Sequence, residues 1–196
     1  AQLAELKKAH PGHPQTTYFE ALVSYLDGNY KAARDLIQQA LKAGFENENV
    51  LVLAASIEME AGSLTQAESL AGRAISLSPR SPAPRRLLAK IQLRSGAYAK
   101  ASQTLSPLLD RPDVDVETLN VAGQVALQSG DLKSAEVHFS KAAAVDPKDA
   151  KSRTALAIAQ MSKGNTEGGL AQLQEIAASD PGVDADLAII AGRMRQ

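Results

Sequence analysis

The residues best suited to chemistry are aromatic, cationic and amide side chains that recur at helical spacing, because such spacing brings side chains onto one face of a helix. They lie thirteen, ten, six and three residues before glycines that recur along the chain. From these positions we select a candidate binding surface, which consists of Tyr18, Tyr25, Val52, Met59, Arg86, Lys90, Asn120 and Gln124. The chemistry that these residue types offer is ligand binding.

Arg86 and Lys90 form the cationic part of this candidate surface. Arginine binds carboxylates through a planar fork of donors, and carboxylates occur on peptides and on acidic polysaccharides alike. The tyrosines and Met59 would supply an apolar platform, while the two amides would hydrogen-bond a ligand. The alternative is that all of these are ordinary solvated or half-buried helix residues, and the sequence leaves both interpretations open.

No motif for catalysis or metal binding stands out. The three histidines lie at His10, His13 and His138, and we interpret them as structural. The aspartates around Pro112 lack the glycine and the terminal glutamate of a calcium loop. A phosphate loop, a zincin helix and a nucleophile elbow are all missing from the sequence, and a chain without cysteine has no thiolate. We therefore expect no catalytic residue, no cofactor and no metal, and we do not expect an enzyme.

Composition narrows the partners further. The formal net charge is -1 and aromatic residues make up 4% of the chain, which argues against sequence-independent binding of nucleic acid. The longest apolar run, at about 50–57, is far shorter than the roughly 20 residues that cross a bilayer. With 44% hydrophobic residues over 196 positions, the chain can bury a sizeable core.

A period of 34 residues runs through the sequence. It is carried by five glycines: Gly28, Gly62, Gly96, Gly130 and Gly164. Each glycine can adopt the left-handed conformation that ends a helix. Prolines close the segment that follows, although Phe45 stands in place of proline in the first full repeat. The pattern predicts two helices per repeat, a first helix before each glycine and a second helix after it.

Small residues keep the same period on both sides of the glycines. At the position seven residues before each glycine lie Ala21, Ala55, Ala89, Gly123 and Ala157. At the position five residues after each glycine lie Ala33, Ala67, Ala101, Ala135 and Gly169. We expect close helix contacts there, where a larger side chain would overpack. The residue after the glycine can cap the second helix at Asn29, Ser63, Asp131 and Asn165, and Ser63 with Gln66 resembles a capping box.

These patterns predict an all-α fold, a right-handed α-solenoid of antiparallel helix pairs in a single array over 1–196. The expected units are a half repeat at 1–13, full repeats at 14–47, 48–81, 82–115, 116–149 and 150–183, and a half repeat at 184–196. Because both ends fall within repeats, we expect a fragment whose apolar ends could dimerise as an artefact of truncation. Pro107 is expected to kink or shorten its helix, and Gly168 has no evident role.

The segment 116–149 carries the family resemblance most strongly, through Gly123, Gly130-Asp131, Ala135, Phe139, Ala142 and Pro147. It resembles a tetratricopeptide repeat, and the other repeats follow the same plan over the whole chain. The chain departs from the usual pattern in having no tryptophan. The resemblance implies that first helices line a concave groove for a protein or peptide ligand. The stripe does not match the carboxylate clamp of chaperone-binding members.

A narrower resemblance rests on features that the repeat itself does not require. These are Arg85-Arg86-Leu87-Leu88-Ala89, Leu105-Ser106-Pro107-Leu108-Leu109, the run 164–170, and Ala177-Ala178-Ser179-Asp180 followed by 185–190. Together they are similar to the tetratricopeptide lipoproteins of bacterial PEP-CTERM/exosortase systems, which are associated with exopolysaccharide production. That resemblance implies a protein of the cell envelope or periplasm whose parent chain is lipid-anchored.

Three functions remain open from the sequence. The first is a non-catalytic scaffold for protein–protein interactions in such an envelope exopolysaccharide system. The second is a carbohydrate-binding module that guides an acidic polysaccharide. The third is a cytoplasmic adaptor that binds peptides.

Overall fold

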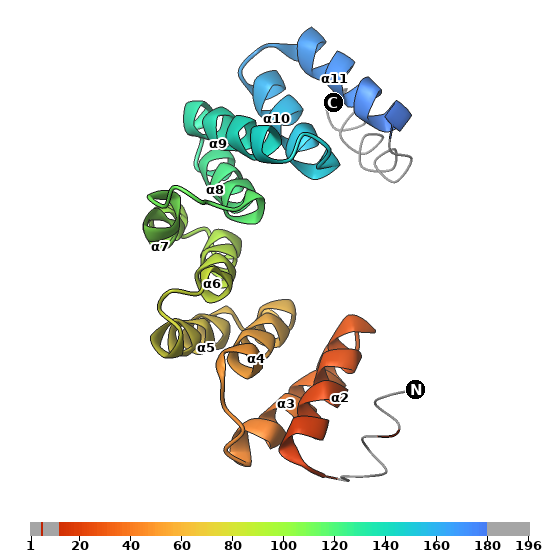
Figure 1. Ribbon diagram of the computed structural model, residues 1–196, viewed down its shortest axis with the longest axis vertical. Helices are drawn as coiled ribbons and strands as arrows, with labels where there is room; N and C mark the ends of the chain where they lie inside the picture. The colour runs from red at the N-terminus through yellow and green to blue at the C-terminus, as the bar shows by residue number, and fades with distance from the viewer. Residues whose placement is uncertain (1–4, 6–11, 180–196) are drawn as a thin grey trace. The chain divides into compact units, whose positions relative to one another are not determined.

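The structure is a computed structural model that describes Glu5 and residues 12–179, and the described part consists of ten α-helices, labelled α2 to α11, without a strand (Figure 1). The first helices are α2 (Pro14–Leu26), α4 (Glu48–Glu60), α6 (Pro82–Arg94), α8 (Val116–Gln128) and α10 (Ala150–Ser162). The second helices are α3 (Tyr30–Lys42), α5 (Leu64–Leu77), α7 (Tyr98–Leu109), α9 (Leu132–Val145) and α11 (Thr166–Ser179). The all-α fold class is confirmed. The two predicted half repeats lie largely outside the described residues.

The helices belong to two compact units, Ala1–Ala97 and Tyr98–Gln196, which we call unit 1 and unit 2 and describe separately. In unit 1 the first helices contact one another in series, α2 with α4 and α4 with α6, while α3 and α5 each contact the next first helix. In unit 2, α8 contacts α10 in the same way, and α9 packs on both. A single array over 1–196 stays a prediction.

The recurrent glycines end the first helices as predicted. Their φ angles lie between 74° and 101°, in the left-handed region that glycine adopts without steric cost. At the first of them, the Gly28 N–H donates to the Tyr25 carbonyl at 3.0 Å and the Asn29 N–H donates to the Ser24 carbonyl at 2.8 Å. This pair of bonds satisfies carbonyls that the helix end leaves without a partner.

The predicted caps of the second helices are confirmed at three positions and wrong at one. Asn29, Asp131 and Asn165 accept a hydrogen bond from the backbone N–H three residues ahead. Ser63 makes no such bond, because its hydroxyl instead accepts from Arg34 Nη2 at 3.2 Å. The capping box with Gln66 is therefore not formed.

The first helices have caps of their own, which were not predicted from the sequence. The residue fifteen positions before each glycine begins the first helix, and its side chain accepts a backbone N–H at His13, Asn47, Asp115 and Asp149. His13 uses Nδ1, which lies 3.2 Å from the Gln15 nitrogen. At the equivalent Ser81 the hydroxyl donates to the Glu48 carboxylate instead.

Both predicted sets of small residues lie in the helix contacts. Apart from Gly123 and Gly169, which are also buried, every one of these residues has 0% exposure. A Cβ atom at Gly123 would lie 2.5 Å from Cε1 of Phe139, a ring that is itself buried. A Cβ at Gly169 would overlap the Met161 side chain and lie 2.8 Å from the Ala157 carbonyl oxygen.

The structure also accounts for the two irregular positions. Pro107 lies in the last turn of α7, which at 12 residues is shorter than the other described helices and continues two residues beyond the proline. Gly168 faces Asn165, the residue that caps the start of the same helix. A Cβ atom at Gly168 would come within 2.7 Å of the Asn165 side chain. Gly168 thus leaves room for Asn165 to accept its N–H.

A partly buried ion pair, between the 40% exposed Arg34 side chain and the buried Glu58, joins neighbouring repeats in unit 1. Arg34 Nε donates to Glu58 Oε1 at 2.8 Å, and Arg34 Nη2 approaches Glu58 Oε2 at 2.5 Å. Glu58 is 4% exposed, so water contributes little to its solvation. One period later, Glu68 stands at the position of Arg34 and Gln92 at the position of Glu58. The Gln92 amide donates to the Glu68 carboxylate at 3.1 Å.

We predict that Gly123→Ala lowers the free energy of unfolding by about 1–3 kcal/mol, because the new methyl group would overlap the buried Phe139 ring. Urea unfolding measures the change. The matched control is Gly72→Ala on α5, where a Cβ meets nothing within 4 Å. That variant should gain about 0.5–1 kcal/mol from helix propensity. A Gly123→Ala protein as stable as the Gly72→Ala protein would contradict this packing.

We also predict that Arg34→Ala costs about 2–3 kcal/mol, because it leaves the buried Glu58 carboxylate without its partner. Arg73→Ala is the control, since Arg73 and its partner Glu46 are both exposed at the surface, where an ion pair contributes at most about 1 kcal/mol. Adding Glu58→Gln to the Arg34→Ala protein should recover part of the loss. Equal losses for the two arginines in thermal or urea unfolding would show that burial of Glu58 has no effect.

Candidate functional site

Four of the predicted site residues lie on the first helices α2 and α4 of unit 1. Tyr18, Tyr25, Val52 and Met59 are half-buried, and all four pack against the continuous hydrophobic core of this unit. Leu22 and Ser56 occupy the same helical stripe and were left out of the predicted site. We call these six residues together the unit 1 surface.

The aromatic side chains of the unit 1 surface are held by ring contacts. The Tyr18 ring meets Phe45 edge-on, with centroids 6.2 Å apart, and it meets Phe19 at 5.2 Å. The Tyr25 and Tyr30 centroids lie 5.7 Å apart. Aromatic pairs at such distances add to the stabilisation from burial.

The two tyrosines of the unit 1 surface are partly buried phenols. The neighbouring Ser56 hydroxyl donates within α4 to the Val52 carbonyl at 2.9 Å. Burial raises the pKa of Tyr25, and the charge of Glu60 raises it further. Burial also raises the pKa of Tyr18. Both phenols are therefore neutral donors at physiological pH, and the surface presents hydroxyl groups within an apolar floor.

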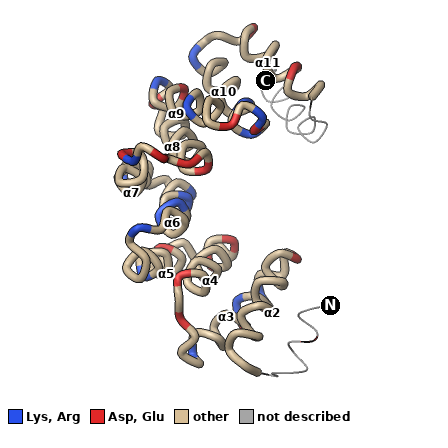
Figure 2. The backbone as a smooth tube through the Cα atoms, viewed as in Figure 1, with Lys and Arg blue, Asp and Glu red and all other residues tan. Residues whose placement is uncertain are grey.

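The next first helix of unit 1, α6, carries the predicted cations. Arg86 and Lys90 are half-buried, and each already has a polar or charged partner within the chain. Figure 2 shows Lys and Arg gathered along α6, in contrast to α2 and α4. Because first helices of this unit contact one another in series, the cationic stripe continues the stripe of the unit 1 surface.

The two predicted amides belong to unit 2, and they differ in exposure. Asn120 is 4% exposed, and its amide nitrogen donates to Ser152 Oγ at 2.8 Å while its Oδ1 accepts from the same hydroxyl at 3.1 Å. It therefore joins α8 to the start of α10, where Asp149 also lies 3.4 Å from its nitrogen. We correct its assignment from ligand binding to repeat packing. Gln124 is half-buried on the same helix.

The Asp149 carboxylate illustrates how this part of unit 2 is tied together. Although partial burial raises its pKa, hydrogen bonds from Ser152 and Asn120 outweigh that effect, so the pKa lies below its ordinary value. Asp149 stays ionised as the cap of α10. This network was absent from the sequence prediction, because it depends on a contact between repeats.

The described residues contain neither a group of three or more potential metal ligands nor a helix long and apolar enough to cross a membrane.

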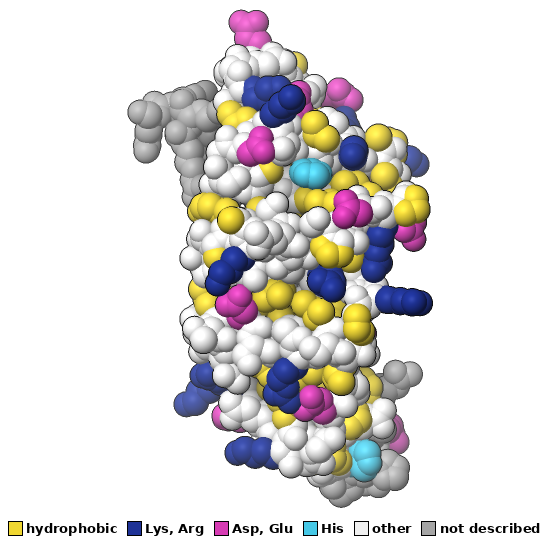
Figure 3. All heavy atoms as spheres, turned by 90° about the vertical axis from the view of Figure 1, so that its left-hand side faces the viewer, with side chains coloured by type: hydrophobic (Ala, Val, Ile, Leu, Met, Phe, Trp, Pro, Cys, Tyr) yellow, Lys and Arg dark blue, Asp and Glu magenta, His cyan; other side chains and the backbone are white. Residues whose placement is uncertain are grey.

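Of the histidines, His13 caps α2. His138 on α9 is half-buried, and burial lowers its pKa, with Lys141 adding to the effect. The face drawn in Figure 3 shows hydrophobic side chains interrupted by charged ones.

Solved structures with the same fold come from several bacteria. A tetratricopeptide protein from Thermus thermophilus has a TM-score of 0.76 at 21% identity and covers 92% of this chain and 98% of its own. MamA from Desulfovibrio magneticus has a TM-score of 0.69 at 13% identity, covering 84% and 93%. YrrB, described as having an unusual peptide-binding site, has a TM-score of 0.63 at 16% identity, covering 98% of each chain.

Sequence comparison gives the family. No curated protein matches the chain. The family model described as "Tetratricopeptide repeat" matches residues 58–117 and 126–191, which is more than half of the sequence. Members of this family are typically non-catalytic scaffolds for protein interactions. The match to the family model, the 34-residue period and the ten described helices agree, and the chain belongs to the tetratricopeptide repeat family.

Proposed function

We propose that this protein is a non-catalytic scaffold that binds a segment of a partner protein on the unit 1 surface and the adjoining cationic stripe of α6. The observation that carries the proposal is an apolar floor on α2 and α4, packed on the core of unit 1, next to the helix α6 that carries Arg86 and Lys90. A ligand meeting this floor would displace water from apolar atoms.

The chemistry of the surface indicates what kind of segment would bind. Apolar side chains of the ligand would cover Val52 and Met59, and a backbone carbonyl could accept from the neutral Tyr25 hydroxyl. Carboxylates would lie toward α6, where Arg86 offers a fork of donors and Lys90 a point charge. Both cations have partners within the chain, so a ligand carboxylate would join or replace an existing contact. The expected ligand is an apolar segment flanked by acidic residues.

The wider setting that we propose is a bacterial envelope system for exopolysaccharide. It is supported by the sequence similarity to tetratricopeptide lipoproteins of PEP-CTERM/exosortase systems, at residues such as Arg85-Arg86 and Leu105–Leu109. In that setting the parent chain would be lipid-anchored and periplasmic, and the scaffold would hold export components together. A peptide ligand is also supported by YrrB, a structure of the same fold that is described as having an unusual peptide-binding site.

We predict that the double charge reversal Arg86→Glu/Lys90→Glu weakens peptide binding at least about tenfold, which corresponds to about 1.4 kcal/mol. Peptides would be selected from a random displayed library on the immobilised protein, and their affinities measured by calorimetry. The selected sequences should combine apolar and acidic residues. Lys31→Glu, an exposed position on the second helix α3, is the matched control and should leave the affinity unchanged.

Two results would count against the proposal. Selected peptides that bind the charge-reversed protein as tightly as the original would remove α6 from the site. Failure to select any peptide, together with heat on titrating the host's acidic polysaccharide, would favour the carbohydrate-binding alternative. Localisation is tested separately, because a parent protein found in the cytoplasm would support a peptide-binding adaptor and contradict the envelope setting.

A further inference from the structure

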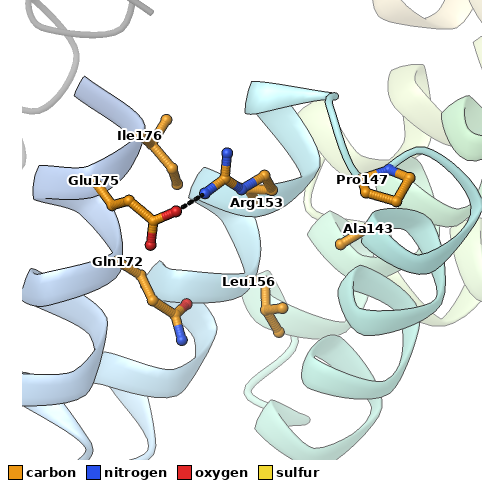
Figure 4. A pocket seen from close by; sticks show the side chains of 7 residues that line it. All are labelled: Ala143, Pro147, Arg153, Leu156, Gln172, Glu175 and Ile176. Atoms are coloured by element: carbon orange, nitrogen blue, oxygen red, sulfur yellow. Dashed lines mark hydrogen bonds and ion pairs between the residues drawn. The ribbon is translucent and has the colours of Figure 1, made fainter. Parts of the chain in front are cut away.

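Unit 2 contains a hollow of about 350 Å³ between the second helices α9 and α11, with α10 beneath it (Figure 4). Its apolar wall consists of Ala143, Pro147, Leu156 and Ile176, and Arg153 and Glu175 lie on its rim. Pockets that hold small ligands begin at roughly this size. None of these residues belongs to the unit 1 surface, so the hollow is independent of the proposed function.

The repeat period shows how the hollow arises. Three periods earlier, the places of Ala143 and Pro147 are taken by Leu41 and Phe45, which pack against the core of unit 1. Replacing a leucine and a phenylalanine by these two smaller residues removes side-chain volume from one side of the equivalent place. On the α9 side the hollow is thus lined by smaller side chains than the equivalent positions of unit 1.

Two residues of the opposite wall change the other way. Leu156 and Ile176 stand where unit 1 has the small residues Ala54 and Ala74. They give the hollow an aliphatic wall, and a space of about 350 Å³ remains beside them. In unit 2 the large apolar side chains thus lie on α10 and α11, and the residue on α9 is small.

Two further lining positions change from apolar to polar, while Glu175 replaces another charged residue, Arg73. Leu51 and Leu70 of unit 1 are buried, with 0% and 4% exposure, and their counterparts in unit 2 are the half-exposed residues Arg153 and Gln172. Unit 1 thus closes this place with its own apolar side chains. Unit 2 lines it with an apolar wall and a polar rim, which is the composition of a binding pocket.

The rim can open at little cost. Arg153 Nη2 lies 3.1 Å from Glu175 Oε1, and the Glu175 side chain is 74% exposed. Figure 4 shows this pair reaching across from α10 to α11 beside the hollow. Exposed pairs of this kind contribute at most about 1 kcal/mol. The Arg153 guanidinium is also complementary in charge to the negative face of an aromatic ring, over which arginine stacks favourably.

We propose that this hollow binds an aromatic side chain presented by a partner protein. The ring packs against Ala143, Pro147 and Ile176, and the Arg153 guanidinium covers its face. The fold then carries a second interaction site, on the side of the second helices of unit 2. A partner with one exposed phenylalanine or tyrosine would be anchored there.

The test uses N-acetyl-phenylalanine amide as the probe, with the methyl signals of Ala143 and Ile176 followed by NMR. These signals should shift in a saturable way at millimolar probe, with much smaller effects from N-acetyl-alanine amide. Ala143→Leu restores the unit 1 residue and should weaken binding at least tenfold, while urea unfolding shows equal or greater stability. Gln172→Leu, which restores the counterpart of Leu70, is a second filling variant should the first not fold.

The proposal fails if the phenylalanine probe leaves the wild-type signals unchanged, or if a folded filling variant binds it as well as the wild type. It also fails as an aromatic site if N-acetyl-leucine amide binds more tightly than the phenylalanine probe. Met59→Glu in unit 1 serves as the control, because it alters the proposed peptide surface and should leave binding of the probe intact.

Discussion

The close approach of the two helices in each repeat is the constraint on which the rest of the structure depends. It is possible only because alanine or glycine occupies both facing positions, and these residues are buried throughout. At Gly123 even a methyl group would overlap the Phe139 ring. The ring fits between the two helices only because residue 123 has no side chain. Because the pairs are held so closely, their first helices can contact one another directly and present one continuous stripe within a unit.

That stripe differs in chemistry from repeat to repeat, although the backbone plan is the same. In unit 1 it passes from tyrosines on α2, through aliphatic residues on α4, to cations on α6. In unit 2 the equivalent stripe includes Asn120, which is used for packing against Ser152. A single repeat plan thus yields a mixed apolar and cationic surface in unit 1 and a surface used partly for packing between repeats in unit 2. The hollow in unit 2 is another such difference, since all but one of its lining residues differ in size or polarity from apolar counterparts in unit 1.

Features set within one repeat were predictable from the sequence, and features set between repeats were not. The glycine at the end of each first helix and the buried small residues depend on local backbone geometry, and both were predicted correctly. Ser63 fails as a cap because Arg34 reaches it from the preceding repeat. The burial of Asn120 and the ion pair of Arg34 with Glu58 likewise arise from contacts more than twenty residues apart. The caps fifteen residues before each glycine are periodic, and comparing the repeats at that position would have found them.

The most direct test of the account is where a selected acidic peptide touches the protein. Titration followed by methyl NMR would compare Val52 and Met59 of the unit 1 surface with Val137, an exposed valine on α9 of unit 2. The account predicts shifts at Val52 and Met59 that saturate with the calorimetric affinity, and an unchanged signal for Val137. Shifts at Val137 without shifts at Val52 and Met59 would contradict it.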